Sequence, residues 1–458
     1  MLTPRKIVEG FFKAPAELLE VAIERTEIEE RKLMNKKPVK LAGEYFNTLG
    51  PGLTTGAADD DPSGIGTYSQ AGAQYGFQLL WLSVFTFPFM AIVQEMCARI
   101  GLVTGQGLAA NIRKNYSRKV LYVITILLFA ANTLNIAADL GAMAASAKLL
   151  FPHIRIPLVL LAFALISLLL QIFTTYARYA RYLKYSALAL LSYVFTAFAV
   201  HINWHEALYS TFVPSITFSK DQIFLLCAIL GTTISPYLFF WQTSQEVEED
   251  ILKGEKTVAQ RKAAVDENVI RHMRYDVWTG MFVSNLIMFF IIAACAATLH
   301  ANGITNIATA DQAASAIRPF GGALTYFFFS LGIIGTGFLA VPVLAGSAAY
   351  AISECFGWKQ GLYRKLKEAY AFYGVIIIAM VVGVIANFAH LDPIKGLIYS
   401  AVANGLVAPV VIFYIVKMSS STKVMHSRKN HPLISLGGWL ITVLMVVSGI
   451  AAIASLFF

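Results

Sequence analysis

Charged residues are scarce in this chain of 458 residues. Asp, Glu, Lys and Arg together make up 14% of the sequence, whereas 57% of it is hydrophobic. The mean hydropathy is +0.63. A soluble globular domain carries about 25% charged residues. The low charge therefore excludes a water-soluble protein, and we expect lipid to cover most of the surface.

Cysteine is also rare. The four cysteines lie in or at the ends of apolar segments and share no metal-ligand spacing, so we interpret them as small buried hydrophobes. No nucleotide-binding loop, nucleophile motif or His/Cys cluster is present, which indicates that the chain is not an enzyme and needs no cofactor. The first forty residues are charged and contain no apolar run, so we expect no cleaved signal.

Long apolar segments dominate the rest of the chain. A helix needs about 20 mostly apolar residues to span a bilayer. Ten segments meet this criterion clearly, and they are centred near residues 87, 130, 165, 193, 232, 285, 340, 380, 405 and 446. An eleventh, weaker candidate covers residues 47–76, where Asp59-Asp60-Asp61 and Pro62 interrupt the apolar pattern.

The distribution of basic residues supports eleven spans with a cytoplasmic N-terminus. In that topology nearly all of the 36 Lys and Arg lie on the cytoplasmic side, as the positive-inside rule expects. The exceptions are Lys148, Arg155, Lys220, Arg318 and Lys395. This bias explains the basic composition without nucleic acid. We therefore expect a multi-pass protein of the cell's inner membrane, which is surrounded by lipid and requires no oligomer.

The chain divides into an arm and a membrane domain. Residues 1–45 are rich in Glu, Lys and Arg with Leu and Ile at helical spacing, which predicts a cytoplasmic amphipathic arm. Residues 46–458 are predicted to form the transporter domain. Within it, the charged segment 247–272 is expected to be an exposed cytoplasmic helix.

Two of the predicted spans contain a break. Residues 54–64 and 231–237 each place small or polar residues and a proline in mid-span. Proline removes a backbone donor, and unwound backbone survives at membrane depth only where protein or a watery cavity supplies hydrogen bonds. These segments are spans one and six, and an offset of five is typical of inverted-repeat transporters. The sequence thus predicts an all-α, leucine-transporter-like fold that works by alternating access.

The predicted repeats follow from that offset. Repeat one covers about residues 46–203 and repeat two about 222–417, and an extra helix covers about 434–458.

The first break carries three adjacent carboxylates. A carboxylate at mid-membrane is costly and predicts a functional role. Asp61, just before Pro62, is the strongest candidate for binding the substrate or a coupling ion, and it could also cap the half-helix that starts there. Of Asp59 and Asp60, one is expected to face the pathway and the other an internal partner.

Polar residues elsewhere in the spans leave alternatives open. Thr232, Thr233 and Ser235 could be ligands or could satisfy the broken backbone. Asp139 could relay a proton or an ion, or could be a buried hydrogen-bonded strut. Asn404 could line the pathway or bond another helix. A further pair, Glu95 and Arg99, lies four residues apart near the end of span two and is interpreted as structural.

From Leu49 through span ten, the chain resembles the Nramp family of divalent metal transporters. The resemblance rests most on Gly50-Pro51-Gly52, Asp61-Pro62, Gln70-Ala71-Gly72-Ala73, Leu79-Leu80-Trp81, the segment from Ala98 to Gly105, and Ala138-Asp139-Leu140. The family's first-span signature, Asp-Pro-Gly-Asn, reads Asp61-Pro62-Ser63-Gly64 here. Its sixth-span signature, Met-Pro-His, reads Ser235-Pro236-Tyr237.

The resemblance implies ligands at only some positions. It implies that Asp61 is the aspartate ligand and that Ala58 and Thr232 supply backbone carbonyls. The family's asparagine ligand has Gly64 in its place, and its thioether ligand has Ser235. The family's sixth-span histidine corresponds to Tyr237, and an acid of its proton route corresponds to Ala142. These departures mark a divergent branch.

The altered positions bear on the substrate. A thioether favours soft transition metals, so an oxygen-only site favours a hard cation such as Mg²⁺ or Mn²⁺ over Fe²⁺. The leading hypothesis is therefore a secondary transporter of divalent metal, with protons as a candidate coupling ion in symport. The alternative is a proton-coupled transporter of a small oxyanion such as bicarbonate, bound by half-helix N-termini together with Ser63, Gly64 and the hydroxyls of residues 232–235.

Overall fold

The described part of the chain is built from helices. In this computed structural model it comprises residues 49–457 except 218, 308 and 390–392, so the predicted arm lies outside it. No β-strand is present among these residues. The helices of the first half are α3 (Pro51–Asp59), α4 (Pro62–Tyr75), α5 (Trp81–Thr104), α6 (Leu108–Asn115), α7 (Arg118–Leu150), α8 (Ile156–Phe173), α9 (Tyr176–Ser186), α10 (Leu191–Ala199) and α11 (Trp204–Phe212).

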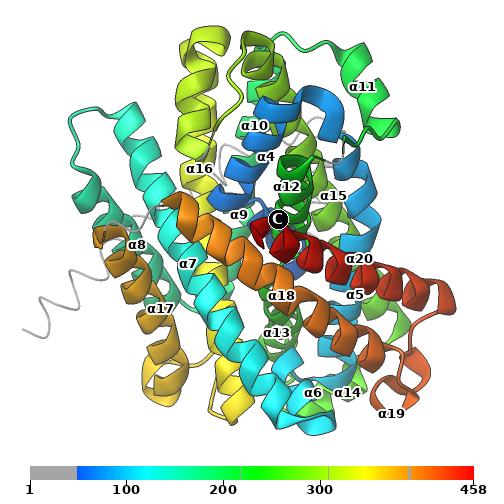
Figure 1. Ribbon diagram of the computed structural model, residues 1–458. Coiled ribbons are helices and arrows are strands. Elements are labelled where there is room, and N and C mark those ends of the chain that lie inside the picture. The colour runs from blue at the N-terminus through cyan, green and yellow to red at the C-terminus, as the bar shows by residue number, and fades with distance from the viewer. Residues whose placement is uncertain (1–48, 218, 308, 390–392, 458) are drawn as a thin grey trace, which may run out of the picture. The chain divides into compact units, whose positions relative to one another are not determined.

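The second half continues in the same way (Figure 1). Its helices are α12 (Lys220–Thr233), α13 (Pro236–Leu252), α14 (Val258–Ala264), α15 (Glu267–Thr298), α16 (Ala310–Phe356), α17 (Tyr370–Phe388), α18 (Pro393–Ser419), α19 (Thr422–Met425) and α20 (Pro432–Phe457). Short 3₁₀ segments complete the described chain, among them η1 (Gly76–Leu79) and η2 (Ala187–Leu190).

Nine helices of the described chain are long and apolar enough to cross a membrane, or ten if the bent pair Val407–Ser419 and Thr422–Arg428 counts as one span. The pair α3–α4 is not among them. The prediction of a polytopic helical protein is therefore confirmed, and the exact number of eleven spans stays a prediction.

Both predicted breaks are present. Helix α3 ends at Asp59 and α4 begins at Pro62, and α12 ends at Thr233 and α13 begins at Pro236. In each case proline occupies the first helical position, where its missing N–H costs nothing. Helices α4 and α12 pack against each other and lie next to each other above α18 in the view of Figure 1, so the two breaks lie in one region.

Glycines allow α3 to lie directly on α15. A Cβ atom added to Gly56 would collide with the backbone of Gly280, and one added to Gly280 would collide with Gly52. Small residues four apart let membrane helices approach this closely. The carboxylate of Asp276, on α15, accepts hydrogen bonds from the amides of Gly52 at 2.6 Å and Leu53 at 3.1 Å. Helix α15 thus both packs against α3 and caps its N-terminus.

The expectation of an exposed helix from residue 247 onward is wrong for its first turns. Residues up to Leu252 belong to α13, and Glu248 and Asp250 are buried. Glu248 accepts hydrogen bonds from the Tyr350 hydroxyl at 2.6 Å and the Leu362 amide at 2.8 Å. A charge run usually marks a solvated face, but here α16 and the loop that follows it supply the donors that make burial possible. Helix α14 is largely exposed, as expected.

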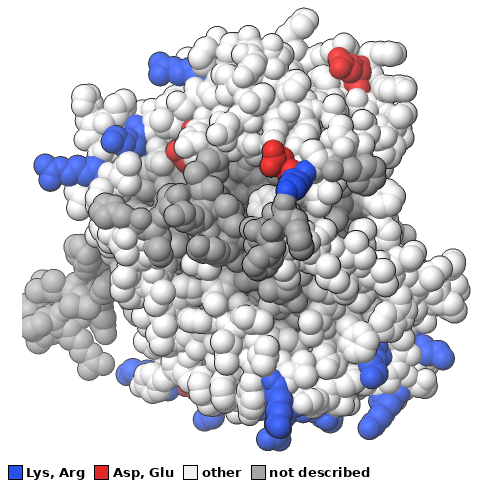
Figure 2. Space-filling view, in the orientation of Figure 1, with Lys and Arg blue, Asp and Glu red and all other residues white. Residues whose placement is uncertain are grey.

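Charge on the visible surface gathers at the two ends (Figure 2). Blue side chains line the lower edge, where α6, α14 and α19 lie in Figure 1, and a smaller group lies at the upper left. Apart from a few charged side chains above the centre and the residues drawn in grey, the surface between them is uncharged in this view. Such a band is what a lipid-facing surface requires.

Candidate substrate site at the helix breaks

The two breaks touch at Gly64. A Cβ atom built on Gly64 would lie 3.1 Å from Thr232 Oγ1 and 3.2 Å from Asp61 Oδ1. The first turn of α4 therefore lies directly against the last turn of α12. The absence of a side chain at Gly64 is what permits this approach.

Asp61 caps α4. Its Oδ1 accepts hydrogen bonds from the Gly64 amide at 2.6 Å and the Ser63 hydroxyl at 2.7 Å. The capping role considered from the sequence is therefore present in the structure. Asp61 is only 1% exposed, so the site is closed to solvent in this conformation.

Asp139 lies at the same helix end. It comes from α7, and its Oδ1 accepts a hydrogen bond from the Ser63 amide at 3.1 Å. Its other carboxylate oxygen is buried and has no hydrogen-bond partner in the described structure. Two carboxylates from distant parts of the sequence thus share the N-terminal donors of α4, where the helix dipole favours negative charge.

Tyr237 reaches across to the first break. Its hydroxyl donates a hydrogen bond to the carbonyl oxygen of Ala58 at 2.8 Å. Tyr237 and Ala58 are both fully enclosed. Tyr237 stands at the position of the family's histidine. It therefore contacts the Ala58 carbonyl, which is one of the ligands that the resemblance implies.

The hydroxyls of the second break mostly form hydrogen bonds within the protein. Ser235 Oγ lies 2.7 Å from the carbonyl of Thr232 and 3.0 Å from that of Gly231, to which it can donate. The hydroxyl of Thr233 lies 3.2 Å from that of Tyr68 on α4. A carbonyl oxygen has two lone pairs, so Thr232 retains one acceptor position for a cation.

The remaining candidates differ in their surroundings. Asp59 Oδ2 accepts a hydrogen bond from Ser284 on α15 at 3.0 Å. Asp60 is fully buried, and neither of its carboxylate oxygens has a hydrogen-bond partner in the described structure. Asn404 of α18 is 3% exposed, and its Oδ1 likewise lacks a partner there.

The structure also adds residues that the sequence analysis missed. Asp276 and Ser284, both on α15, hold the start of α3 and the side chain of Asp59. Tyr68 contacts the second break. Asp276 could have been found, because it is an acid in an apolar helix. Ser284 and Tyr68 carry no such signal, since single hydroxyls are common in membrane helices.

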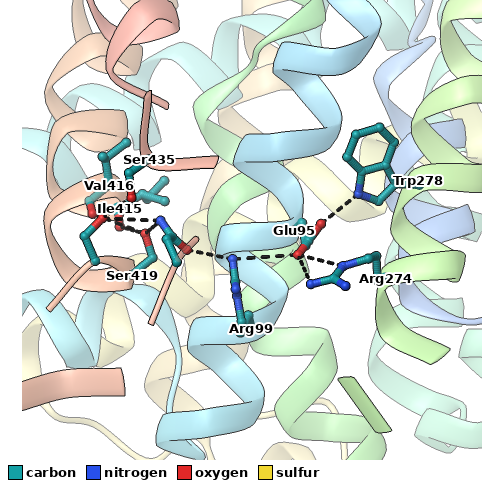
Figure 3. Close-up of polar contacts among 10 residues, drawn as sticks. Glu95, Arg99, Arg274, Trp278, Ile415, Val416, Ser419 and Ser435 are labelled. Atoms are coloured by element: carbon teal, nitrogen blue, oxygen red, sulfur yellow. Dashed lines mark hydrogen bonds and ion pairs between the residues drawn. The ribbon is translucent and has the colours of Figure 1, made fainter. Parts of the chain in front are cut away.

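The Glu95–Arg99 pair belongs to a separate structural network (Figure 3). Glu95 accepts hydrogen bonds from Arg274 at 3.0 Å and Trp278 at 2.7 Å, and these link α5 to α15. Arg99 lies 3.7 Å from Glu95 and donates to Asn430 at 2.6 Å. The structural interpretation of this pair is confirmed.

Within the described residues, no three His, Cys, Asp or Glu side chains converge closely enough to hold a metal ion. A cation at the breaks would therefore depend on one carboxylate together with carbonyl and hydroxyl oxygens. Such an oxygen-only shell is the kind that hard cations accept.

Comparison with known proteins agrees with this architecture. Among solved structures, a manganese transporter of Eremococcus coleocola, in complex with an aromatic bis-isothiourea substituted compound, has a TM-score of 0.68 at 18% identity, over 90% of this chain and 87% of that chain. Mhp1, a nucleobase-cation-symport-1 family transporter in a closed conformation, has a TM-score of 0.56 at 14% identity, over 89% of this chain and 91% of that chain. At such identities the likeness shows the shared fold.

The family assignment rests on sequence. A family model described as natural resistance-associated macrophage protein-like, Nramp, matches residues 52–455, which is nearly the whole membrane part. This agrees with the resemblance carried by the motifs between Gly50 and Leu140 and with the prediction of a transporter rather than an enzyme. The chain belongs to the Nramp family.

Proposed function

We propose that this protein is a secondary transporter of divalent metal cations. The observation that carries the proposal is the buried carboxylate of Asp61 at the point where the two helix breaks meet. A carboxylate at membrane depth is expensive and marks an ion pathway by default. The manganese transporter with the same fold adds support for a divalent substrate.

In this proposal three groups bind the cation. Asp61 supplies the negative charge, and Ala58 and Thr232 supply carbonyl oxygens from the ends of α3 and α12. The C-terminal ends of half-helices carry partial negative charge and therefore favour a cation. The hydroxyl of Tyr237 now holds the Ala58 carbonyl, so it must share that oxygen with the cation or release it.

The ligand set favours a hard cation. Ser235 offers an oxygen where the family has a sulfur, and Gly64 offers no side chain where the family has an amide. Mg²⁺ keeps much of its water and needs only one or two carboxylates. We therefore propose that Mg²⁺ and Mn²⁺ are preferred over Fe²⁺, because a soft ligand is missing.

Asp139 is proposed as a relay for a proton or an ion. It and Asp61 meet at Ser63, whose amide donates to Asp139 and whose hydroxyl donates to Asp61. A change in the charge of one carboxylate therefore alters the electrostatic potential at the other. Asp59 and Asp60 directly precede Asp61 in the chain and are also buried, so they are further relay candidates.

Alternating access is proposed for the transport cycle. The site is closed in this conformation, because Asp61 and Tyr237 are each 1% exposed. A cation can reach Asp61 only if the helices around the breaks move apart. Helices α3 and α13 are joined by the Tyr237–Ala58 hydrogen bond, and this contact must loosen when the site opens toward their side.

The oxyanion alternative is less well supported. An anion would need the free N-terminal donors of α4. The amides of Ser63 and Gly64 already donate hydrogen bonds to Asp139 and Asp61, respectively. An incoming anion would meet two carboxylates in place of free amides.

The test is uptake into proteoliposomes that contain the purified full-length protein. Mg²⁺, Mn²⁺, Fe²⁺ and bicarbonate are offered separately, and empty liposomes give the background. Uptake of Mg²⁺ or Mn²⁺ above background, abolished in Asp61→Asn, is the expected result. Uptake of bicarbonate alone would overturn the proposal.

A further inference from the structure

A half-open cavity of about 140 Å³ lies at the end of α13 that is farther from the helix breaks. It is lined by that end of α13, the loop before α6, the start of α14, and the end of α16 with the loop that follows it. Helices α6, α13 and α14 lie in the lower part of the molecule in Figure 1, where basic side chains gather in Figure 2. None of the proposed substrate ligands lines this cavity, so it is separate from the site at Asp61.

Two carboxylates from different helices face the cavity. Glu248 of α13 is 2% exposed, and Glu354 of α16 is 3% exposed. The Tyr350 hydroxyl of α16 donates a hydrogen bond to Glu248 at 2.6 Å, and the Ser244 hydroxyl of α13 lies 3.4 Å from Glu354. Ser244 and Glu248 are one helical turn apart, as are Tyr350 and Glu354. The two carboxylates therefore lie about one turn from each other.

The loop after α16 also brings the carboxylates close together. The side-chain amide of Gln360 donates to Glu354 at 2.8 Å, and the backbone amide of Leu362 donates to Glu248 at 2.8 Å. One residue separates these two donors, and consecutive Cα atoms are about 3.8 Å apart. Glu248 and Glu354 therefore share one small space.

The hydrogen bonds around the cavity fit ionised carboxylates. Each of the four carboxylate oxygens accepts a hydrogen bond from an N–H group. The donors are Leu362 and Tyr363 for Glu248, and Gln360 and Ala110 for Glu354. A protonated carboxyl would turn its O–H toward an N–H group, which cannot accept a hydrogen bond. These donors therefore stabilise the charged form.

The cavity has more negative than positive charge. The ion pairs among the described residues involve neither carboxylate. Arg261 lines the same cavity, but its guanidinium donates to three backbone carbonyl oxygens, those of Gly105, Glu255 and Lys256. Two carboxylates and one guanidinium leave one excess negative charge. Buried charge without a partner is costly, so a bound cation would stabilise this region.

The size and chemistry of the cavity suit a hydrated divalent cation. A water molecule takes about 30 Å³ in the liquid, so the cavity has room for about four or five. Mg²⁺ takes six ligands, keeps several waters and is bound through one or two carboxylates. Retained water is needed here, because no three His, Cys, Asp or Glu side chains of the described chain converge. The Oε1 atom of Gln360, which is buried and accepts no hydrogen bond in the described structure, offers an acceptor for one such water.

We propose that Glu248 and Glu354 form a second metal site, which binds one hydrated divalent cation at the end of the molecule where α6 and α14 lie. The bound ion joins α13 to α16. Helix α13 is continuous from Pro236 to Leu252, and its other end carries Tyr237, which contacts the first break at Ala58. An ion at Glu248 therefore holds the closed conformation of the substrate site.

This regulatory role rests on the proposed function, whereas binding of the ion does not. Metal that accumulates on the side of the membrane where the cavity opens should slow further uptake. When that side is free of metal the cavity is empty, and transport is not restrained.

The binding test uses Mn²⁺, whose EPR signal distinguishes free from bound ion, and the purified full-length Asp61→Asn protein. This background removes the proposed substrate site, and one Mn²⁺ per chain should still bind saturably. Adding Glu248→Gln or Glu354→Gln should weaken that binding at least roughly tenfold, because each removes a charged ligand. Tyr350→Phe is the matched control. It removes a buried hydroxyl of the same cavity but no proposed ligand, so binding should change by less than about threefold.

A further variant tests the site without changing either carboxylate. Val258 of α14 is half-buried and lines the cavity, so Val258→Trp should fill the space of the water shell and weaken Mn²⁺ binding at least roughly tenfold. Each variant is first checked for monodisperse elution and for a melting temperature in metal-free buffer close to that of its parent. The absence of saturable Mn²⁺ binding in Asp61→Asn would overturn the inference, as would binding that survives Glu248→Gln, Glu354→Gln and Val258→Trp.

The regulatory role is tested by initial Mn²⁺ uptake into proteoliposomes loaded with Mg²⁺ or with choline. Random insertion places the cavity inside for about half of the chains, so internal Mg²⁺ should slow wild-type uptake by up to roughly twofold. Val258→Trp should not be slowed in this way, and equal slowing of both proteins would reject regulation through this site. Mn²⁺ binding that depends on Glu248 and Glu354, without any uptake by wild type, would uphold the metal site and reject the proposed function.

Discussion

The hydroxyl of Tyr237 donates a hydrogen bond to the carbonyl oxygen of Ala58 over 2.8 Å. This contact joins the first turn of α13, after the second break, to the last turn of α3, before the first break. It occupies one of the two lone pairs of a carbonyl that is proposed as a metal ligand. The tyrosine is therefore placed to compete with the cation.

Removing that competitor should strengthen metal binding. In Tyr237→Phe the Ala58 carbonyl is freed, and a net hydrogen bond is worth about 1 kcal/mol, or about fivefold in affinity. We expect the Kd for Mn²⁺, measured by calorimetry, to fall about that much. Tyr68→Phe is the matched control, because it removes a buried hydroxyl that contacts Thr233 and leaves Ala58 unchanged. Weaker binding in Tyr237→Phe would instead make the tyrosine oxygen a ligand.

Asp61→Asn should abolish metal uptake while the protein remains folded. Asparagine is as good a helix cap as aspartate, so α4 keeps its N-terminal hydrogen bonds. The negative charge that replaces the ion's lost water is gone. Proteoliposome uptake and size-exclusion chromatography measure the two effects.

Glu354→Gln is a suitable control for Asp61→Asn. It also removes a buried carboxylate, but one that accepts a hydrogen bond from the Ala110 amide at the distant α6. Its uptake should stay close to wild type. Near-normal flux in Asp61→Asn would remove this residue from the mechanism.

The breaks could be predicted from sequence because a proline among polar residues has no other explanation in an apolar span. Pro62 and Pro236 begin α4 and α13 as expected. The contact of Asp139 with the Ser63 amide could not be predicted, because it depends on how α7 packs against α4. The burial of Glu248 was missed for the same reason, since its donors lie in α16 and the following loop, more than a hundred residues away.

Selectivity should follow the softness of the ligand at position 235. Ser235→Met adds a thioether and should raise the affinity for Mn²⁺ and Cd²⁺ relative to Mg²⁺. Adding Gly64→Asn restores an amide oxygen, although its Cβ would lie 3.1 Å from Thr232 Oγ1, so the last turn of α12 must shift slightly. Competition of each metal against Mn²⁺ uptake measures the order.

Ser235→Ala is the control for these selectivity variants. It removes the hydroxyl without adding sulfur, so it should not favour Cd²⁺. If the double variant binds no soft metal at all, the divalent-cation proposal loses its main support.

Topology can be tested at α14. The positive-inside bias predicts that this helix is cytoplasmic. Ala259→Cys places a thiol on its exposed side, next to Val258. A membrane-impermeant maleimide should label this variant in inverted vesicles and not in intact cells. Labelling from outside intact cells would reject the predicted orientation, and the parent protein serves as the background, since Cys97, Cys295 and Cys355 are buried.

The pH dependence of binding separates a cation from an anion. A metal competes with protons for Asp61, so its affinity should rise with pH, by up to about tenfold per pH unit while the carboxyl is largely protonated. An oxyanion would need Asp61 protonated, because two negative charges in a closed site repel each other. Its affinity would fall as pH rises. Calorimetry with Mn²⁺ and with bicarbonate between about pH 5 and about pH 8 measures both trends. We expect the first, and Asp61→Asn should remove it. Binding that strengthens on acidification, with no Mg²⁺ or Mn²⁺ signal at any pH, would contradict a cation at this site.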